Sequence, residues 1–257
     1  MNTREYRGWL KRAGEIKEVN DHLTLEHPLT VRINGEAFTL TMHTPGDELD
    51  LIRGLFFSEG IYKKREGKLR ANILKRSPEN FISEVDIELN ESELDKGLLN
   101  KRNLLSVASC GICGKTELPS LEGKKLVSEI SDTDHSFDKM FDEMLSHQKA
   151  FDKSGGCHAA SIFNKQHQLM GVREDIGRHN AVDKIIGHLL NEGQLKEAKY
   201  LLVSGRVSYE IITKCFTAGI PYLAAVSAPS SLAVDFAKEL GIQLYGFVRE
   251  GRWTKYA

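Results

Sequence analysis

Residues 200–248 read YLLVSGRVSYEIITKCFTAGIPYLAAVSAPSSLAVDFAKELGIQLYGFV. Short apolar runs typical of strands alternate in this stretch with helical patterns, and short turns join them. The predicted strands are 200–203, 222–226 and 243–248, and the predicted helices are 209–218 and 232–240. Strands that alternate with helices in this way pair in parallel through right-handed crossovers. The stretch therefore predicts an α/β domain.

The residues before this stretch extend the same domain. Two strands at 159–163 and 169–173 flank a short turn, and a helix follows at 179–190. A helical stripe precedes them, formed by Phe137, Met140, Phe141, Met144, Leu145 and Gln148. We therefore expect residues 136–257 to form a three-layer α/β/α mixed sheet, in which an antiparallel pair joins a parallel set. This arrangement is that of a cytidine-deaminase-like sheet, although other α/β strand orders fit the pattern as well.

The first 135 residues predict a smaller N-terminal α+β subdomain. Strands at 29–33 and 37–42 flank Asn34-Gly35, a pair suited to the positive φ angles of a type I′ hairpin turn. Thr44-Pro45-Gly46-Asp47 provides an N-cap and a proline for a helix that ends near Gly60. A basic segment at 62–76 predicts a solvated strand edge or loop, and an alternating pattern at 81–89 predicts a strand.

Residues 90–135 show the least periodicity in the sequence. They are polar and rich in Ser, Glu, Lys and Asp, and they contain a Cys-x-x-Cys pair at Cys110 and Cys113. A segment of this length without a pattern is usually functional or disordered. We expect a long mobile connection that carries the two thiols.

Composition excludes several classes of partner. The chain has 35 Lys+Arg and 36 Asp+Glu, a formal net charge of −1, so no global field favours nucleic acid or an anionic membrane. Its beginning, MNTREYRGWLKRAGEIKEV, lacks the apolar core of a signal peptide. No stretch reaches the roughly 18 apolar residues that span a bilayer. We expect a cytoplasmic protein without a membrane segment, and its composition is compatible with a homodimer.

Three turns between strands and helices are candidates for ligand binding. Residues 174–178, 204–208 and 227–231 each follow a predicted strand and open a helix, so all three fall on one edge of the sheet. Unpaired N–H groups at helix starts attract phosphate, and Arg173, Arg178 and Arg206 add donors suited to phosphate oxygens. A single turn of this kind usually only caps its helix. Three together favour a polyanion such as a nucleotide-bearing cofactor.

Two further segments are expected at the same edge. The end of the last strand, Phe247-Val248-Arg249-Glu250-Gly251-Arg252, adds two guanidinium groups. Residues 154–160, SGGCHAA, enter the first strand of the domain, where two glycines allow close backbone approach. His158 in this segment is either a ligand-binding or proton-donating group or a structural histidine.

The spacing of Cys110 and Cys113 allows three interpretations. Glycine-containing backbone and a nearby Lys favour a low-pKa, nucleophilic thiol. The alternatives are half of a zinc site, completed by Cys157 and His158, or a disulfide redox switch. A zinc deaminase is excluded, because Ala159 and Ala160 follow His158 and the Cys pair precedes it in the chain. Cys215 is expected to be a buried apolar residue.

These residues resemble a known family, the formate dehydrogenase accessory sulfurtransferases or FdhD family. The resemblance lies in residues 110–114, 155–160, 173–184, 204–208, 227–229 and 246–256. It implies a cytidine-deaminase-like fold without zinc. It also implies a protein that takes sulfur from a cysteine desulfurase and delivers it to the molybdenum bis(molybdopterin guanine dinucleotide) cofactor of formate dehydrogenase, with the catalytic subunit of that enzyme as a partner.

Carried over by position, the resemblance makes Cys110 the persulfide intermediate and Cys113 its helper. The resemblance and the three turns expected at one edge of the sheet together predict a set of cofactor-binding residues. These are His158, Arg178, Ser204, Gly205, Arg206, Ser227, Phe247, Val248, Arg249, Glu250, Gly251 and Arg252. Cys157 stands where a small or polar residue is expected, so it is either a second sulfur-handling group or incidental. The alternative function is a chaperone that binds the cofactor and uses the Cys pair structurally or with zinc.

Overall fold

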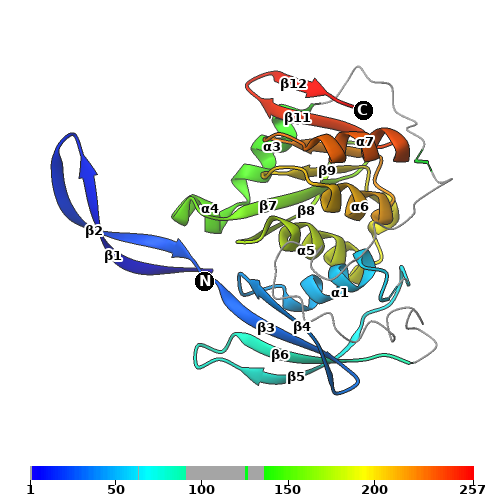
Figure 1. The fold of residues 1–257 in the computed structure, drawn as a ribbon, viewed down its shortest axis with the longest axis horizontal. Coiled ribbons are helices and arrows are strands. Elements are labelled where there is room, and N and C mark those ends of the chain that lie inside the picture. Colours follow the sequence, from blue (N-terminus) through cyan, green and yellow to red (C-terminus); the bar gives the residue numbers. More distant parts are fainter. Residues whose placement is uncertain (1, 63, 91–124, 127–135) are drawn as a thin grey trace.

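A computed structural model describes residues 2–62, 64–90, 125–126 and 136–257. These residues form a six-stranded sheet, a four-stranded sheet and a separate two-stranded ribbon. Figure 1 shows the larger sheet with its helices at one end of the molecule, the smaller sheet beyond helix α1, and the ribbon projecting away from both. Within these residues, no helix is both long and apolar enough to cross a bilayer.

The larger sheet has the strand order β12-β11-β10-β9-β7-β8. Its strands are β7 (His158–Phe163), β8 (Leu169–Asp175), β9 (Tyr200–Val203), β10 (Tyr222–Ala225), β11 (Gln243–Arg249) and β12 (Arg252–Lys255). The strands β9, β10 and β11 pair in parallel, whereas β7 is antiparallel to both β8 and β9. The predicted mixed sheet is therefore confirmed. Strand β12 was not predicted; it returns antiparallel along β11.

Helices cover both faces of this sheet, as the pattern predicted. One face packs against α5 (Arg178–Asn191), α6 (Tyr209–Ala218) and α7 (Ser231–Leu240). The other packs against α3 (Phe137–Ser146), which the short helix α4 (Lys149–Ser154) follows. Alternate residues of a strand serve the two layers: Ala160 and Ile162 of β7 join the first core, and Ala159 and Phe163 join the second. The likeness to cytidine deaminase stays a prediction.

The smaller sheet has the order β4-β3-β6-β5. Its strands are β3 (His27–Ile33), β4 (Glu36–His43), β5 (Arg70–Arg76) and β6 (Ile82–Glu88). The predicted hairpin turn is confirmed, with Asn34 and Gly35 at φ angles of 51° and 83°. The basic segment supplies β5, an exposed edge strand. The sheet packs its own core against α1 (Glu48–Ser58), so the N-terminal half has the expected α+β character. The division of the chain near residue 135 stays a prediction.

Helix α1 also joins the two sheets, because it packs along α5. Two glycines set how closely the helices approach. A Cβ added at Gly187 would lie 1.9 Å from the Asp50 carbonyl oxygen, and one added at Gly54 would lie 1.9 Å from the Asp183 carbonyl oxygen. Both obstacles are backbone atoms, so no side-chain adjustment relieves them. This close crossing of α1 and α5 fixes the smaller sheet relative to the larger sheet.

The ribbon of β1 (Thr3–Arg12) and β2 (Glu15–Thr24) was not predicted from the sequence. Its strands are exposed on both faces, and Trp9 keeps 73% of its surface in solvent, so no alternation of buried and exposed residues marks them. The base of the ribbon is fixed by a hydrogen bond of 2.7 Å between the hydroxyls of Thr24 and Ser154 in α4. The ribbon therefore starts beside the edge of the larger sheet.

Candidate functional site

The three predicted turns lie at one edge of the larger sheet. Strands β8, β9 and β10 run in the same direction, so the turns that follow them emerge together. The turns after β9 and β10 are also hydrogen-bonded to each other: Val207 N–H donates to the Ala228 carbonyl at 3.1 Å, and Ser230 N–H donates to the Val207 carbonyl at 2.9 Å. This pairing fixes the spacing between the starts of α6 and α7.

His158 lies at this edge, at the start of β7, between the turns that follow β8 and β9. The Ser204 hydroxyl lies 3.4 Å from its Nδ1 and accepts a hydrogen bond of 2.9 Å from Ala159 N–H. A Cβ added at Gly205 would lie 3.2 Å from the same Nδ1 and 3.4 Å from the Cβ of Arg178. Glycine at position 205 thus lets His158 at the start of β7 and Arg178 in the turn after β8 lie close to the turn after β9.

The environment of His158 favours its neutral imidazole, because it lowers the pKa of this side chain. Partial burial lowers its pKa, and the positive charges of Arg178 and Arg206 lower it further, against the opposing effect of Asp175. A neutral imidazole carries one donor and one acceptor nitrogen. At physiological pH the side chain is therefore suited to hydrogen bonding with a ligand and leaves the positive charge of the site to the arginines.

The arginines at this edge differ in their partners. The Nε of Arg178 is buried and has no hydrogen-bond partner among the described residues, and Arg206 is exposed. Arg173 was also expected to supply charge for phosphate, but it is occupied elsewhere. Its guanidinium lies 3.5 Å from Asp47 and 3.1 Å from Asp50 of α1. Arg178 and Arg206 therefore remain as the cationic groups of the turns.

The C-terminal segment reaches the same edge through an irregular stretch of β11. Phe247 has a φ of 55°, which is rare for a bulky residue, and its N–H donates to the Ser227 carbonyl at 3.3 Å. The sheet register shifts between Gly246 and Arg249. The chain then turns at Glu250 and Gly251 and returns as β12, which begins at Arg252. Backbone strain of this kind is typical of functional sites.

A pocket of about 680 Å³ opens between this edge and helix α3. It is lined by Asp138, Phe141, Asp142, Met144, Leu145, Gln148, Phe151, Gly155, Gly156, Cys157, His158, Ile176, Ser204, Val226, Val248, Arg249 and Glu250. Five of the predicted binding residues are among them. Gly205 and Arg178 adjoin the pocket through His158. Gly251 adjoins it through a hydrogen bond of 3.2 Å to Asp138.

Comparison with known proteins assigns the chain to a family. A family model described as FdhD/NarQ family matches residues 24–257. The chain belongs to the FdhD/NarQ family. The ribbon of β1 and β2 lies almost entirely outside the matched residues.

Curated relatives of this FdhD/NarQ family member carry the name sulfur carrier protein FdhD. The protein of Streptomyces avermitilis is 39% identical, over 96% of this chain and 90% of its own length. That of Saccharolobus solfataricus is 36% identical, over 91% of this chain and 88% of its own length. A solved structure shares the fold with a TM-score of 0.72 and 23% identity, covering all of this chain and 97% of its own. It is titled "Crystal structure of a putative formate dehydrogenase accessory protein from Desulfotalea psychrophila".

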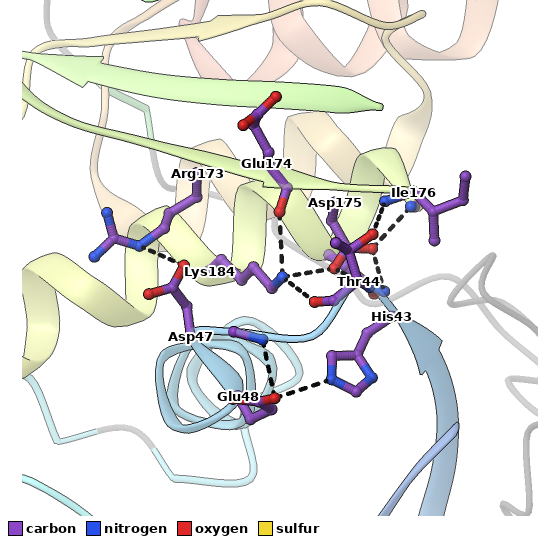
Figure 2. Close-up of polar contacts among 12 residues, drawn as sticks. His43, Thr44, Asp47, Glu48, Arg173, Glu174, Asp175, Ile176 and Lys184 are labelled. Carbon is purple, nitrogen blue, oxygen red and sulfur yellow. Dashed lines mark hydrogen bonds and ion pairs between the residues drawn. The ribbon is translucent and has the colours of Figure 1, made fainter. Parts of the chain in front are cut away.

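Much of the 173–184 segment, on which the resemblance to the FdhD family partly rests, is structural. Figure 2 shows the Asp175 carboxylate among donors from both halves of the chain. It accepts hydrogen bonds from Thr44 N–H (3.0 Å), Gly177 N–H (2.8 Å) and the Asn180 amide (3.0 Å), and its Oδ2 lies 2.8 Å from Lys184 Nζ. Both members of this ion pair are buried. The pair fixes the turn that carries Arg178 to the site.

The same network corrects one expectation about the first helix. Thr44 was expected to cap it, but α1 begins at Glu48, after Asp47 in a left-handed conformation. The Thr44 hydroxyl instead accepts a hydrogen bond of 3.0 Å from Ile176 N–H, and its carbonyl accepts one of 2.7 Å from Lys184. Residues before α1 therefore attach the smaller sheet to this edge of the larger sheet. Charged residues within an apolar helical stripe, as at Lys184, are the sequence signal for such a contact.

The cysteines of this FdhD/NarQ family member fall into two groups. Cys110 and Cys113, the predicted catalytic pair, lie outside the described residues. Cys157 and Cys215 are buried, and neither forms a disulfide. Burial, assisted by the charges of Glu174 and Asp175, raises the pKa of Cys157 to about 12. Burial also raises the pKa of Cys215. A second sulfur-handling role for Cys157 is therefore disfavoured, although it borders the pocket.

We predict that Cys157 resists alkylation in the folded protein. A pKa near 12 leaves about a thousandfold less thiolate at pH 8 than a thiol of ordinary pKa near 9. Iodoacetamide labelling followed by peptide mass spectrometry measures this directly. Cys157 is expected to stay unmodified in buffer and to react readily in guanidinium chloride. Equal labelling rates in the two conditions would contradict the assignment.

Among the described residues, no cluster of His, Cys, Asp and Glu side chains has the arrangement of a metal site. The zinc alternative for the Cys pair involved Cys157 and His158 as additional ligands. His158 is close to Arg178 and Arg206, whose positive charges oppose a cation. The described part of the site therefore favours an anionic ligand.

Proposed function

We propose that this chain is a sulfur carrier that acts in the cytosol for formate dehydrogenase. It takes sulfur from a cysteine desulfurase as a persulfide on Cys110 and transfers it to molybdenum bis(molybdopterin guanine dinucleotide). Membership of the FdhD/NarQ family, with relatives named sulfur carrier protein FdhD, supports the carrier function. The observation that carries the proposal is the convergence of His158, Ser204, Gly205 and Arg178 beside a pocket of about 680 Å³.

The sheet edge fits the phosphate groups of such a substrate. Gly177 and Ser208 precede α5 and α6, and neither helix start is capped by the side chain of its N-cap residue. The N–H groups there are suited to phosphate oxygens. Arg178, whose buried Nε lacks a described partner, and the exposed Arg206 add charge-assisted donors. Gly205 keeps the backbone open beside His158.

The C-terminal segment closes the other side of the same space. Val248, Arg249 and Glu250 line the pocket, and Arg249 places a guanidinium at its rim. Asp138 holds the turn of this segment through Gly251 N–H at 3.2 Å. The segment is therefore positioned to contact a substrate that lies along the edge, in agreement with the role that the family resemblance gives to residues 247–252.

The proposed chemistry is two sulfur transfers. A Cys110 thiolate attacks the outer sulfur of the desulfurase persulfide, the S–S bond breaks, and the desulfurase cysteine leaves as a thiolate. In the second step the outer sulfur leaves Cys110, which returns to a thiolate. The sulfur takes two electrons from the reduced metal of the substrate and becomes a sulfido ligand. Cys113 assists the first thiol, and the described residues bind and orient the substrate.

The function is tested by the intact mass of the protein after incubation with a cysteine desulfurase and cysteine. We expect the wild type to gain one sulfur, about 32 Da, that a reductant removes. Cys110→Ala should abolish the gain, whereas Cys215→Ala should retain it because that thiol is buried. An unchanged wild-type mass, or stoichiometric zinc bound through Cys110 and Cys113, would instead favour a cofactor-binding chaperone.

A further inference from the structure

The basic segment that supplies β5 carries charge that the proposed substrate site does not use. Residues 63–76 contain seven Lys and Arg residues and one Glu, in a chain whose formal net charge is −1. Two of the cations have structural roles, since Arg65 donates to carbonyls at the end of α6 and Arg76 donates to the turn before β6. Three others are exposed and form no hydrogen bond or ion pair with the residues that the structure describes: Lys68, Arg70 and Lys75.

The carboxylates of the neighbouring strand do not pair with these cations. Glu88 and Glu84 of β6 lie opposite Arg70 and Lys75 in the register of the sheet. Glu84 instead pairs with Arg32 of β3 at 2.5 Å. Glu88 accepts a hydrogen bond of 2.6 Å from a side-chain amide of β5. Both cations are therefore free to meet an acidic partner.

Apolar side chains lie between these cations. Ile73 is opposite Val85 of β6, so both point to the face of the sheet that packs on α1. Val85 is fully buried, whereas Ile73 keeps 42% of its surface in solvent. Leu74 keeps 54%. The core beneath the sheet thus ends before β5, and two large apolar residues remain uncovered at its edge.

The backbone of β5 is also open on one side. The strand order β4-β3-β6-β5 places it at an edge, with a neighbouring strand only on the side of β6. Cationic side chains on an edge strand repel a second basic strand, but they attract an acidic one. Phosphates of a nucleic acid would match the cations but not Ile73 and Leu74. Charge and apolar surface together fit an acidic protein segment that also carries apolar residues.

The position of β5 suits one of the two sulfur-transfer partners. Figure 1 shows β5 on the far side of α1 from the larger sheet, and so away from the proposed substrate site. Strand β6 ends at Glu88, and the segment that carries Cys110 follows it in the chain. Arg70 and Asn90 line one pocket of about 560 Å³, so the basic edge borders the start of that segment.

We propose that the edge of β5 docks the sulfur donor, through a segment of the donor that carries Asp and Glu beside apolar residues. This inference rests on the proposed function, which requires a cysteine desulfurase to reach Cys110. Arg70 and Lys75 attract the acidic groups, and Ile73 and Leu74 are covered by the apolar ones. The donor and the substrate then use separate surfaces of the chain.

The rate of sulfur gain from a cysteine desulfurase and cysteine tests the proposal. Arg70→Glu combined with Lys75→Glu should slow the gain at least about tenfold at low ionic strength, because charge complementarity raises association rates by about 10 to 10³. At high ionic strength the difference from the wild type should shrink, since salt screens exposed charges. Leu74→Ser should slow the gain at both ionic strengths, because it removes apolar contact and leaves the charge unchanged.

Two controls distinguish docking from thiol reactivity. Arg12→Glu combined with Lys17→Glu makes the same charge change on exposed residues of the ribbon and should match the wild type. Inorganic polysulfide is a small sulfur donor that needs no docking surface, so it should load the β5 variants as fast as the wild type. Circular dichroism verifies that each variant is folded.

Hydrogen exchange locates the contact directly. Adding the desulfurase to the full chain should slow amide exchange in residues 70–76, and the double charge reversal should remove this protection. Exchange in this strand that is unchanged by the desulfurase would overturn the inference. Protection by RNA in place of the desulfurase would also overturn it and would identify a nucleic-acid surface.

The outcomes separate this inference from the proposed function. Equal rates for the wild type and the β5 variants with the desulfurase would show that the donor docks elsewhere, and equally slow loading by polysulfide would show a change in the thiol. Either result would overturn the inference and leave the carrier function intact. A wild type that gains no sulfur from either donor would refute the proposed function, while hydrogen exchange still decides whether the desulfurase binds at β5.

Discussion

Replacing Asp175 by alanine is expected to lower the free energy of unfolding by about 3–5 kcal/mol. The change leaves Lys184, which keeps 1% of its surface in solvent, as a buried charge without its counterion. It also removes the acceptor for Thr44 N–H and Gly177 N–H. Breaking one partner of a buried pair costs far more than the pair contributes, because the remaining charge stays desolvated. Urea unfolding followed by circular dichroism measures the difference.

Two further variants serve as controls for this prediction. Glu66→Ala removes an exposed ion pair with Lys196 and should change the stability by about 0–1 kcal/mol. Combining Asp175→Ala with Lys184→Met should recover part of the loss, since no unpaired charge then remains. A loss below about 1 kcal/mol for Asp175→Ala would show that water or a rearranged donor compensates, contrary to the buried network of Figure 2.

Gly187→Ala is expected to destabilise the protein by about 1–3 kcal/mol or more. In an ordinary helix the same change stabilises by about 1 kcal/mol, because alanine has the higher helix propensity. Here the new Cβ would lie 1.9 Å from the Asp50 carbonyl oxygen and 2.7 Å from Gly54 N, so α1 and α5 must separate. The sign of the effect therefore distinguishes a close helix crossing from an isolated helix.

The control for this variant is Gly8→Ala in the ribbon, where nothing lies within 4 Å of an added Cβ. Gly8→Ala should leave the melting temperature nearly unchanged, whereas Gly187→Ala should lower it. An increase in stability for Gly187→Ala would mean that the two helices adjust without cost. The crossing would then not hold the two sheets together.

The sequence predicted the larger sheet because burial imposes a regular apolar pattern on its strands and helices. Strand β9 is buried along its whole length and α6 has one apolar face, so period and length distinguish them. The ribbon of β1 and β2 escaped prediction for the opposite reason. It contributes to none of the hydrophobic cores, so burial imposes no pattern on its residues.

The positions of the candidate site residues were predicted correctly where sheet topology decides them, and wrongly where contacts between distant segments decide them. The turns at 204–208 and 227–231 had to emerge together because their strands are parallel. Nothing local indicates that Arg173 would pair with Asp50, more than a hundred residues earlier. Gln148 was included in the helical stripe, yet α3 ends at Ser146, and only the structure shows that this residue lines the pocket.

The burial of Cys157 and Cys215 has a practical consequence for spectroscopy. Two of the four cysteines in the chain, Cys157 and Cys215, are buried and have raised pKa values. Thiol-reactive probes should therefore not label them in the native protein. A fluorophore or spin label introduced under native conditions should report from positions 110 and 113 alone, without first engineering the scaffold. Because a labelled Cys110 can no longer carry sulfur, distances from those labels to a second label at the sheet edge would report where the thiol pair lies relative to the pocket and not the transfer itself.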